Sequence, residues 1–582
     1  MNNLAPIFTK TTECQDCYKC IRQCPVKAIR VENGHATILS HMCIHCGNCV
    51  IHCPSSAKRI RDDLSRAKQL LTLKEKVIVS VAPSFSAEFS DFTHQEFIAA
   101  LKKLGFWGVS ETALGADLVS AELATYLKEK TESQNQQKLF LSSACPAVVE
   151  YIKQYKKELS PYITDLASPL LAHVRYLKKI YGENIGVVFI GPCVAKKRES
   201  DVWHTIDTVL TFEELRRWFE SEGIRSDALT ISEDTNFIPE RAAKGSLYPV
   251  DGGMIAATKK YHKLKNIKMM AISGIHQIQE ALEDLEPEQL KTPLFMELLS
   301  CPGGCVNGPG TDSVESSAMK RVRVIDYAEE SREVINQEEI ENSPDLSGTL
   351  PVEDIAQIDY SEEEIRTALR SVGKFTPVDE LNCSSCGYDS CRHFATAMLD
   401  NRAEKTMCVS YMRKLAQKQA NSLIKSIPSG VVIANKNLEI VECNLNFAKM
   451  MGSDVEKLFN KNSGLEGFSL EKIASFSRFF SDVLELNGPD VIERDVHFGK
   501  KIFHVSVFAI EKESIAGGVI EDITAPQVQR HRIVSQARKV IDKNLSVVQK
   551  IAFLLGENAA ETESILNSII QSFSEGEEDE DY

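Results

Sequence analysis

The sequence of 582 residues predicts a multidomain protein of mixed α/β and α+β class. A chain of this length exceeds what one hydrophobic core supports. Three regions also differ in pattern: grouped cysteines lie near the N-terminus, strand and helix patterns alternate in the middle, and a strand-containing stretch precedes a helical C-terminal part. We therefore expect several separately folded parts along one chain.

The composition is that of a soluble globular protein. Hydrophobic residues make up 43% of the chain and charged residues 26%, and no apolar run is long enough to cross a bilayer. The N-terminus carries neither a signal-peptide core nor a twin-arginine motif. The net charge of −15 argues against nucleic-acid binding by the whole chain. We therefore expect a cytoplasmic protein with no membrane and no nucleic-acid partner.

The chain has 17 cysteines, and their grouping indicates metal sites rather than disulfides. Residues 1–58 contain two runs of C-x2-C-x2-C-x3-C-P, the bacterial two-cluster ferredoxin pattern, in which the fourth cysteine of each run binds the other cluster. The expected 4Fe–4S ligand sets are Cys14, Cys17, Cys20 and Cys53 for one cluster, and Cys43, Cys46, Cys49 and Cys24 for the second. Zinc knuckles are the alternative, although zinc sites rarely use this triple spacing twice. The expected role is electron transfer.

A third group of cysteines lies in residues 361–418. Its members are Cys383, Cys386, Cys391 and Cys408. The group resembles a small 4Fe–4S module found in several redox enzymes, and a zinc site is the alternative because C-x2-C with two distant cysteines is also a zinc pattern. Cys443 stands apart from every group, and we interpret it as a buried structural cysteine rather than a redox reporter.

The middle region has the pattern of an α/β fold. The strand-like run 77–81 precedes Ala82-Pro83-Ser84, and the apolar run 185–190 ends at Gly191-Pro192-Cys193. A cysteine at the carboxyl end of a buried strand lies where α/β folds place their sites. Further cysteines of this region also stand beside glycine or proline, where backbone can approach an inorganic cofactor closely; they are Cys145, Cys301 and Cys305.

Together with the ferredoxin pattern in front of them, these motifs over residues 76–324 resemble the H-cluster domain of FeFe-hydrogenases. The resemblance implies that Cys145, Cys193 and Cys301 hold a 4Fe–4S cubane. It implies that Cys305 bridges the cubane to a two-iron subsite with CO, cyanide and dithiolate ligands. The complete cofactor set would be this H-cluster and three further 4Fe–4S clusters.

Two further positions match residues that contact the cyanide ligands in that family. Lys196 corresponds to the lysine that hydrogen-bonds one cyanide, and Ser84 to the residue that contacts the other. A buried ammonium offsets the charge of cyanide in a dry pocket and fixes its orientation. The alternative for Lys196 is an ordinary surface lysine beside Lys197 and Arg198.

The departures from the family pattern concern proton transfer. Catalytic members usually carry a cysteine directly before the first cubane ligand, where this chain has Ala144, and a methyl group cannot relay a proton. Gly191 replaces a common methionine, and Gly308-Pro309-Gly310 replaces a glycine triplet. A relay carboxylate is also missing, with Leu123 at the aligned position. We expect a hydrogenase of low turnover.

The C-terminal half is organised like a sensor. An acidic linker is expected over residues 325–360. Residues 419–525 resemble a PAS domain, with a hairpin start after Ile427 and the exit Asp522-Ile523-Thr524. His497 and His504 have no motif around them, so a haem is not favoured. Residues 526–573 are expected to form dimerisation or output helices, and 574–582 a disordered acidic tail.

These observations favour a sensory, PAS-containing FeFe-hydrogenase of the group C type. It would bind or slowly oxidise H2 and pass the redox signal to the PAS domain. The expected partners are H2 and protons, a ferredoxin-like or other redox partner, hydrogenase maturation proteins, a second copy in a homodimer, and a separate output kinase or phosphatase. The alternatives are a metabolic ferredoxin-linked hydrogenase and a non-enzymatic iron–sulfur scaffold without the two-iron subsite.

Overall fold

The computed structural model describes residues 5–132, 137–232, 234–312, 314–355 and 358–524, and isolated positions between 536 and 545. The chain divides into two units, Met1–Met412 and Arg413–Tyr582. The expected output helices, apart from those isolated positions, and the acidic tail lie outside the described residues. None of the helices within the described ranges combines the length and the apolar character needed to span a membrane.

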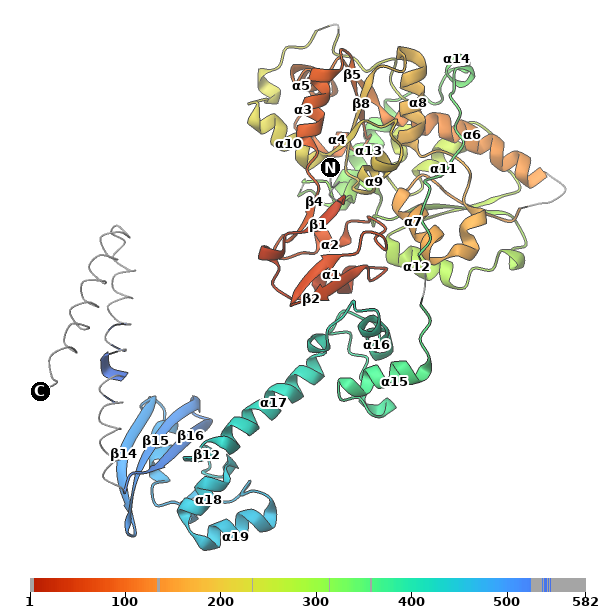
Figure 1. The fold of residues 1–582 in the computed structure, drawn as a ribbon. Helices are drawn as coiled ribbons and strands as arrows, with labels where there is room; N and C mark the ends of the chain where they lie inside the picture. The colour runs from red at the N-terminus through yellow and green to blue at the C-terminus, as the bar shows by residue number, and fades with distance from the viewer. Residues whose placement is uncertain are drawn as a thin grey trace, which may run out of the picture. The chain divides into compact units, whose positions relative to one another are not determined.

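The N-terminal cysteine-rich segment is a small α+β fold of two antiparallel strand pairs (Figure 1). β1 (Ile7–Thr9) pairs with β4 (Lys58–Ile60), and β2 (Ile29–Glu32) pairs with β3 (His35–Ile38). Two short helices carry cysteines between the strands; they are α1 (Lys19–Gln23) and α2 (Asn48–Ile51). The two halves repeat one plan, as expected from the repeated cysteine run.

The first sheet of the middle region is parallel, with strand order β6-β5-β8-β9. Its central strands β5 and β8 are buried along their whole length, which explains their continuous apolar sequence. Helices α3 and α10 contact β8 or β9, and α5 and α8 contact β6 and β5. The strands are β5 (Val77–Val81), β6 (Gly108–Glu111), β8 (Gly186–Gly191) and β9 (Thr208–Thr211). The helices are α3 (Leu64–Leu73), α5 (His94–Lys103), α8 (Pro169–Tyr181) and α10 (Phe212–Ser221).

A second parallel sheet has the order β10-β11-β7. It is short, and its central strand β11 is buried at every position. The strands are β7 (Leu139–Leu141), β10 (Lys268–Ser273) and β11 (Leu294–Leu299). The longer helices of this part are α6 (Thr112–Glu132), α7 (Pro146–Tyr155) and α12 (Ile275–Glu283), with shorter ones at α4 (Phe85–Glu88), α9 (Ala195–Val202) and α11 (Gly253–Thr258). Both sheets therefore present the carboxyl ends of parallel strands to the loops that carry the predicted site.

The segment predicted as an acidic linker differs from that prediction. Its first residues complete α13 (Ser317–Glu329), and α14 (Gln337–Glu341) follows. Leu346 and Leu350 are buried in the middle region, and the backbone N–H of Ala167 donates to Leu346 O at 2.7 Å. The acidic composition concealed these few anchoring apolar residues. Residues 335–350 therefore form a strap over the first unit rather than a free linker.

Three helices follow the strap. They are α15 (Glu362–Ser371), α16 (Cys391–Leu399) and α17 (Val409–Ser426). α15 packs against α16, and their shared core includes Leu369 and Ala395. The third cysteine group belongs to this small helical module.

The second unit contains one antiparallel sheet of five strands, in the order β13-β12-β16-β15-β14. Phe447 and Phe480, from its helices, pack with Phe503 of the sheet in a separate core. Gly518 makes room for the ring of Phe480, since a Cβ there would lie 2.4 Å from it. The strands are β12 (Gly430–Asn435), β13 (Ile440–Cys443), β14 (Val491–Phe498), β15 (Lys501–Glu511) and β16 (Ile515–Asp522). The helices are α18 (Leu445–Met451), α19 (Ser453–Asn462) and α20 (Arg478–Leu484).

Candidate functional site

Four loops meet at one place, and each follows the carboxyl end of a parallel strand. Ser84 follows β5, Cys193 follows β8 and Cys145 follows β7, while residues 301–305 follow β11. β5 and β8 belong to the first sheet, whereas β7 and β11 belong to the second. Parallel sheets place ligand sites at this end of their strands, so both sheets contribute to a single site.

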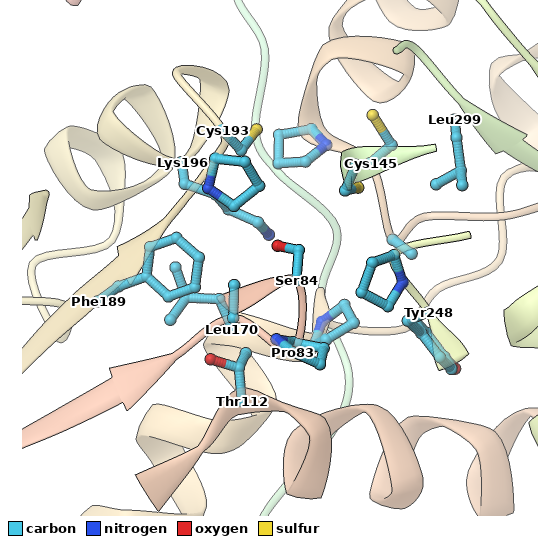
Figure 2. A pocket seen from close by; sticks show the side chains of 17 residues that line it. Pro83, Ser84, Thr112, Cys145, Leu170, Phe189, Cys193, Lys196, Tyr248 and Leu299 are labelled. Carbon is cyan, nitrogen blue, oxygen red and sulfur yellow. The ribbon is translucent and has the colours of Figure 1, made fainter. Parts of the chain in front are cut away.

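These loops surround a cavity of about 100 Å³ (Figure 2). Its wall is mainly apolar, with Leu170, Phe189 and Leu299 among the lining residues. The predicted site residues that line it are Ser84, Ala144, Cys145, Cys193, Lys196 and Cys305. Cys301 is not part of the wall, but it lies in the same turn as Cys305, where Gly304 N–H donates to Cys301 O at 3.0 Å. Burial and the charges of Cys305, Cys193 and Cys145 raise the pKa of its thiol. The structure thus brings all seven predicted residues together.

The turn between Cys301 and Cys305 depends on its two glycines. Gly303 and Gly304 have φ angles of +75° and +100°, which favour glycine. A Cβ on Gly304 would lie 2.2 Å from the carbonyl oxygen of Pro249, which lines the cavity. The glycine pair therefore lets one tight turn present both cysteines.

The four thiols form a donor set that suits an iron–sulfur group. Burial raises the pKa of the Cys193 thiol to about 11, and the charge of Cys145 adds to this effect. Burial likewise raises the pKa of Cys305 well above its usual range, again with contributions from Cys145 and Cys193. Thiolates grouped in an apolar pocket repel one another, and a bound cationic metal centre offsets that repulsion.

Lys196 is buried at the cavity, with 8% of its surface exposed. Its ammonium donates to Glu199 Oε2 at 2.6 Å and to Ser168 Oγ at 2.9 Å. Lys196 is therefore paired with a buried carboxylate at the cavity wall, and the alternative of an ordinary surface lysine is wrong.

Ser84 supplies a hydroxyl group that lacks a partner. Its side chain is 2% exposed, and its Oγ forms no hydrogen bond within the part of the chain that the structure describes. Buried hydroxyl groups in folded proteins almost always have a partner, because an unsatisfied one costs about 1–3 kcal/mol. Ser84 projects into the cavity (Figure 2). A ligand that accepts a hydrogen bond there would fit the residues present.

The structure explains two of the departures from the family pattern. A Cβ on Gly191 would lie 2.5 Å from Cζ of Phe189, so that ring occupies the space of a side chain at position 191. A Cβ on Gly47, in the ferredoxin segment, would lie 2.4 Å from Cγ of Pro309. Pro309 therefore packs directly against the loop between two ferredoxin cysteines.

Nothing in the described wall takes over the missing proton relay at Ala144. Leu123, the position aligned with a relay carboxylate, is fully buried in the apolar core around α6, and Glu122 beside it is exposed. The methyl group of Ala144 faces the cavity beside Cys145. The wall therefore lacks a titratable side chain at both expected relay positions.

The ferredoxin segment groups its cysteines as the crossed pattern expects. A cavity of about 20 Å³ is lined by Cys24, Cys43, Cys46 and Cys49. For the other set, burial and the charges of Cys14, Cys17 and Cys53 raise the pKa of Cys20 to about 11. The fourth cysteine of each run thus lies with the other run.

A buried contact that sequence reasoning missed joins this segment to the cavity. His45, between two cysteines of the second set, lies 2.8 Å from Glu150 Oε2 through its Nδ1. Glu150 belongs to α7, which begins directly after Cys145. The charge of Cys46 also contributes to the raised pKa of Cys301. The second ferredoxin set and the cavity therefore lie next to each other.

Lys197 was also missed, because its neighbours in the sequence give no sign that it is buried. It is fully buried, and its ammonium donates to Asp63 Oδ2 and to Glu214 Oε1, both at 3.0 Å. No sequence pattern indicates that Asp63 and Glu214 lie beside Lys197 in the fold. The ion pair ties the segment after the ferredoxin to the helices behind Cys193.

The third cysteine group surrounds a cavity of its own. This cavity has a volume of about 20 Å³. All four predicted ligands line it, namely Cys383, Cys386, Cys391 and Cys408. Cys391 and Cys408 are buried, Cys386 is half-buried and Cys383 is exposed, and four thiols at one point fit a cubane cluster.

Comparison with known proteins assigns the type of three parts of the chain. Residues 75–309 match the family model "Iron only hydrogenase large subunit, C-terminal domain". Residues 6–54 match "4Fe-4S dicluster domain", and residues 379–410 match an Fe-S cluster model. The chain therefore contains a hydrogenase-type domain preceded by a two-cluster iron–sulfur module.

Curated relatives include hydrogenases and an assembly factor. "Iron hydrogenase 1" of Clostridium pasteurianum is 26% identical over 45% of this chain and 55% of its own length. The periplasmic Fe hydrogenase large subunit of Nitratidesulfovibrio vulgaris is 27% identical over 51% of this chain and 84% of its own. "Cytosolic Fe-S cluster assembly factor narfl" of Xenopus tropicalis is 25% identical over 42% and 64%. The chain thus spans only about half the length of the Clostridium relative.

Proposed function

We propose that the chain is a sensory FeFe-hydrogenase that binds H2 or slowly interconverts it with two protons and two electrons. One observation carries the proposal: three thiols, a buried ammonium and an unpartnered hydroxyl group line the same apolar cavity. Cysteine thiolates hold iron–sulfur clusters, and a few polar groups in an otherwise apolar pocket fix the orientation of a small ligand.

Cys145, Cys193 and Cys301 would hold the cubane of an H-cluster, and Cys305 would bridge it to the two-iron subsite. When bound, this group supplies the iron at which hydrogen is split or formed. The support from this chain is the grouping of the four cysteines, together with burial that raises the thiol pKa values of Cys193, Cys301 and Cys305.

The chain's own residues bind and orient the subsite. The Lys196 ammonium, held by Glu199, provides a positive charge for one anionic ligand, and the Ser84 hydroxyl group can donate to a second. Phe189 and Leu299 contribute apolar wall that excludes water and strengthens these interactions. The pocket is thus suited to small anionic ligands on a metal.

Proton transfer is the step for which this site is least suited. Ala144 stands where a proton-carrying cysteine is expected from the family, and a methyl group neither donates nor accepts a proton. Slow turnover suits a receptor of hydrogen better than a metabolic catalyst. This feature favours the sensory hypothesis over the metabolic alternative.

The electron path would run through the ferredoxin segment. Its second cysteine set lies beside the cavity, and the buried contact between His45 and Glu150 holds the two parts together. A ferredoxin-like or other redox partner would exchange electrons at this segment. The proposal includes three 4Fe–4S clusters in addition to the H-cluster.

The second unit would act as the sensory output domain. Its five-stranded antiparallel sheet, with helices packed in a core of large apolar residues, supports the PAS resemblance. It would convey the redox signal to a separate kinase or phosphatase, and the chain would act as a homodimer. Maturation proteins would deliver the two-iron subsite.

A non-enzymatic iron–sulfur scaffold is the competing function, since a curated relative is named as an assembly factor. A scaffold needs the cysteines but has no use for an unpartnered hydroxyl group and a buried ammonium at a cavity. The hydrogen oxidation rate of the chain matured with the two-iron subsite separates the two functions. We expect slow but measurable reduction of a viologen dye by H2, and loss of this activity in Cys305→Ser.

The comparison requires equal cubane content in both proteins, measured as bound iron. A matured chain that contains the two-iron subsite and neither oxidises H2 nor changes spectroscopically in its presence would refute the proposal. Turnover as fast as that of efficient hydrogenases would instead refute the sensory part of it.

A further inference from the structure

The third cysteine group lies against the ferredoxin segment, through contacts between residues that are 360 or more positions apart in sequence. Three of the hydrogen bonds between the two segments lie near β2, and each has a backbone group as donor or acceptor. Val31 N–H donates to Arg402 O at 2.9 Å, and Asn33 N–H donates to Glu404 Oε1 at 2.6 Å. The Arg402 guanidinium donates to Lys27 O at 3.3 Å. The helical module is therefore docked along β2 and its turn (Figure 1).

The cluster loops themselves also meet. The Arg22 guanidinium donates to Cys17 O at 3.0 Å and to Ser385 O at 3.3 Å. Cys17 is a predicted ferredoxin ligand, and Ser385 lies between two predicted ligands of the module. One side chain thus spans the two cysteine loops.

The loops approach each other closely because of a glycine. Gly387 has a φ of +93°, and a Cβ there would lie 2.8 Å from Cγ2 of Ile21 in α1. The Lys27 ammonium donates to Gly387 O at 3.0 Å from the other side. A side chain larger than hydrogen at position 387 would push the module away from the ferredoxin.

Tyr388 packs in one cluster with cysteines of both groups, among them Cys20 of the ferredoxin and Cys408 of the module. It is 2% exposed, and its hydroxyl group has no hydrogen-bond partner among the described residues. The ring therefore belongs to a core that both cysteine groups share.

We propose that the docked module is the last relay of an electron path, and that its cluster exchanges electrons directly with the ferredoxin clusters. One electron leaves a reduced ferredoxin cluster and enters the oxidised module cluster, with no bond formed or broken. The inference rests on the proposed function for its electron source, H2, which supplies two electrons and releases two protons. It deepens that function because α17, which leads into the second unit, begins directly after the ligand Cys408.

The test uses electron paramagnetic resonance of the full-length chain with its cubanes reconstituted and reduced by dithionite. Neighbouring reduced clusters split each other's signals. The two ferredoxin clusters already split each other's signals, so we expect an additional splitting that disappears in Cys391→Ala, which removes the module cluster. Because dithionite replaces H2, the result does not depend on hydrogenase activity, and reduction of the module by H2 in the matured chain then tests the link to the proposed function.

Gly387→Ala tests the docking itself. It should abolish the additional splitting while iron content remains that of the wild type. Gly373→Ala is the matched control, since Gly373 has a φ of +72° in the same module but nothing within 4 Å of its Cβ position, and it should retain the additional splitting. If Gly387→Ala loses iron, Glu404→Ala outside the cysteine loops replaces it, with the same expected loss of the additional splitting.

Two outcomes would overturn the inference. The first is a wild-type spectrum equal to the sum of the Cys391→Ala spectrum and an isolated module signal. The second is additional splitting that persists unchanged in a fully loaded Gly387→Ala protein and in Glu404→Ala.

Discussion

The methyl group of Ala144 marks the clearest difference between this cavity and one adapted to fast proton transfer. It lines the cavity beside Cys145, and it can neither donate nor accept a proton. A positioned proton donor or acceptor contributes roughly 10²–10⁴-fold to a rate. We expect the lack of one at this position to limit turnover without affecting the cysteines of the cavity.

Ala144→Cys should therefore raise the rate of H2 oxidation by about 10- to 100-fold. The reason is that a thiol at this position can carry protons to and from the cavity. Ala144→Val is the matched control, since it adds comparable bulk without an exchangeable proton, and it should give no gain. The comparison uses dye-linked assays of H2 oxidation on the matured wild-type protein, Ala144→Cys and Ala144→Val. Equal oxidation rates for these three proteins would show that proton transfer at this position does not limit the reaction.

Phe189 and Gly191 form a complementary pair on β8. They lie two residues apart in a strand, so both face the cavity. The Phe189 ring lies where a side chain at position 191 would begin. The Phe189 ring thus fills the space that a side chain at position 191 would otherwise occupy.

Gly191→Met should destabilise the fold by about 1–3 kcal/mol through overpacking. The double variant Gly191→Met/Phe189→Ala should lose less stability than the sum of the losses in the two single variants, because the Phe189 ring no longer competes for the space. Urea unfolding of the four proteins measures the coupling. If the losses of stability in the two single variants simply add up in the double variant, the two side chains do not share this space. Ala82 limits how much stability the double variant regains, because its Cβ lies 2.8 Å from the position of a Cβ on residue 191.

The grouping of the cysteines was predictable at the residue scale because their spacing is part of the chemistry: a cluster needs four thiols, and short loops can hold three of them. Glu150, Lys197 and Phe189 were not predictable. Glu150 and Lys197 act through partners more than 100 residues away in sequence, namely His45 and Asp63. Phe189 acts through its close contact with Gly191. Single-sequence patterns contain no record of such contacts.

At the scale of elements, α8 is held to the first sheet by a buried histidine. His173 is fully buried, and its Nδ1 and Nε2 lie 2.8 Å and 2.9 Å from the hydroxyl groups of Ser80 on β5 and Ser110 on β6. Burial lowers the pKa of His173 from its ordinary 6.5 to about 3. The helix is therefore fixed by a neutral imidazole.

This arrangement predicts a specific acid sensitivity. Because the pKa is lower in the folded than in the unfolded state, the stabilisation is present above pH 6.5 and is lost as pH falls towards 3. Between pH 7 and pH 5, the loss should reach about 2 kcal/mol, at about 1.4 kcal/mol per pH unit below 6.5. His173→Gln should lower stability at pH 7 but show a smaller drop on acidification.

Thermal unfolding of both proteins at pH 7 and pH 5 measures the difference. His276→Gln is the control, since His276 is exposed on α12 and should leave the pH response unchanged. A wild-type protein and a His173→Gln variant with parallel pH responses would contradict the prediction.

The strands and helices of the middle region followed from sequence periodicity, since buried parallel strands are continuously apolar. The strap over residues 335–350 did not. Its anchors are isolated residues such as Ile335, Leu346 and Leu350 within an acidic stretch. Hydrogen bonds from Arg175 and Lys153 to its carbonyl groups fix the rest, and such backbone contacts leave no pattern in side-chain composition.

At the scale of the whole molecule, the first unit brings four groups of thiols into one continuous arrangement. The module lies on the ferredoxin, and the ferredoxin lies on the cavity. Sequence spacing indicated the groups and their ligand sets, but it could not indicate their order in space. In the proposed function, this order places the cavity at one end of the electron path and the module, which directly precedes α17, at the other end.

The central claim is that the cavity binds a two-iron subsite that responds to hydrogen. The most direct test is an infrared spectrum of the matured chain in the CO and cyanide stretching region, recorded with and without H2. The account predicts bands in both ranges that shift when H2 is added. Intact cubanes without any such bands would contradict it and leave a cluster-bearing redox scaffold.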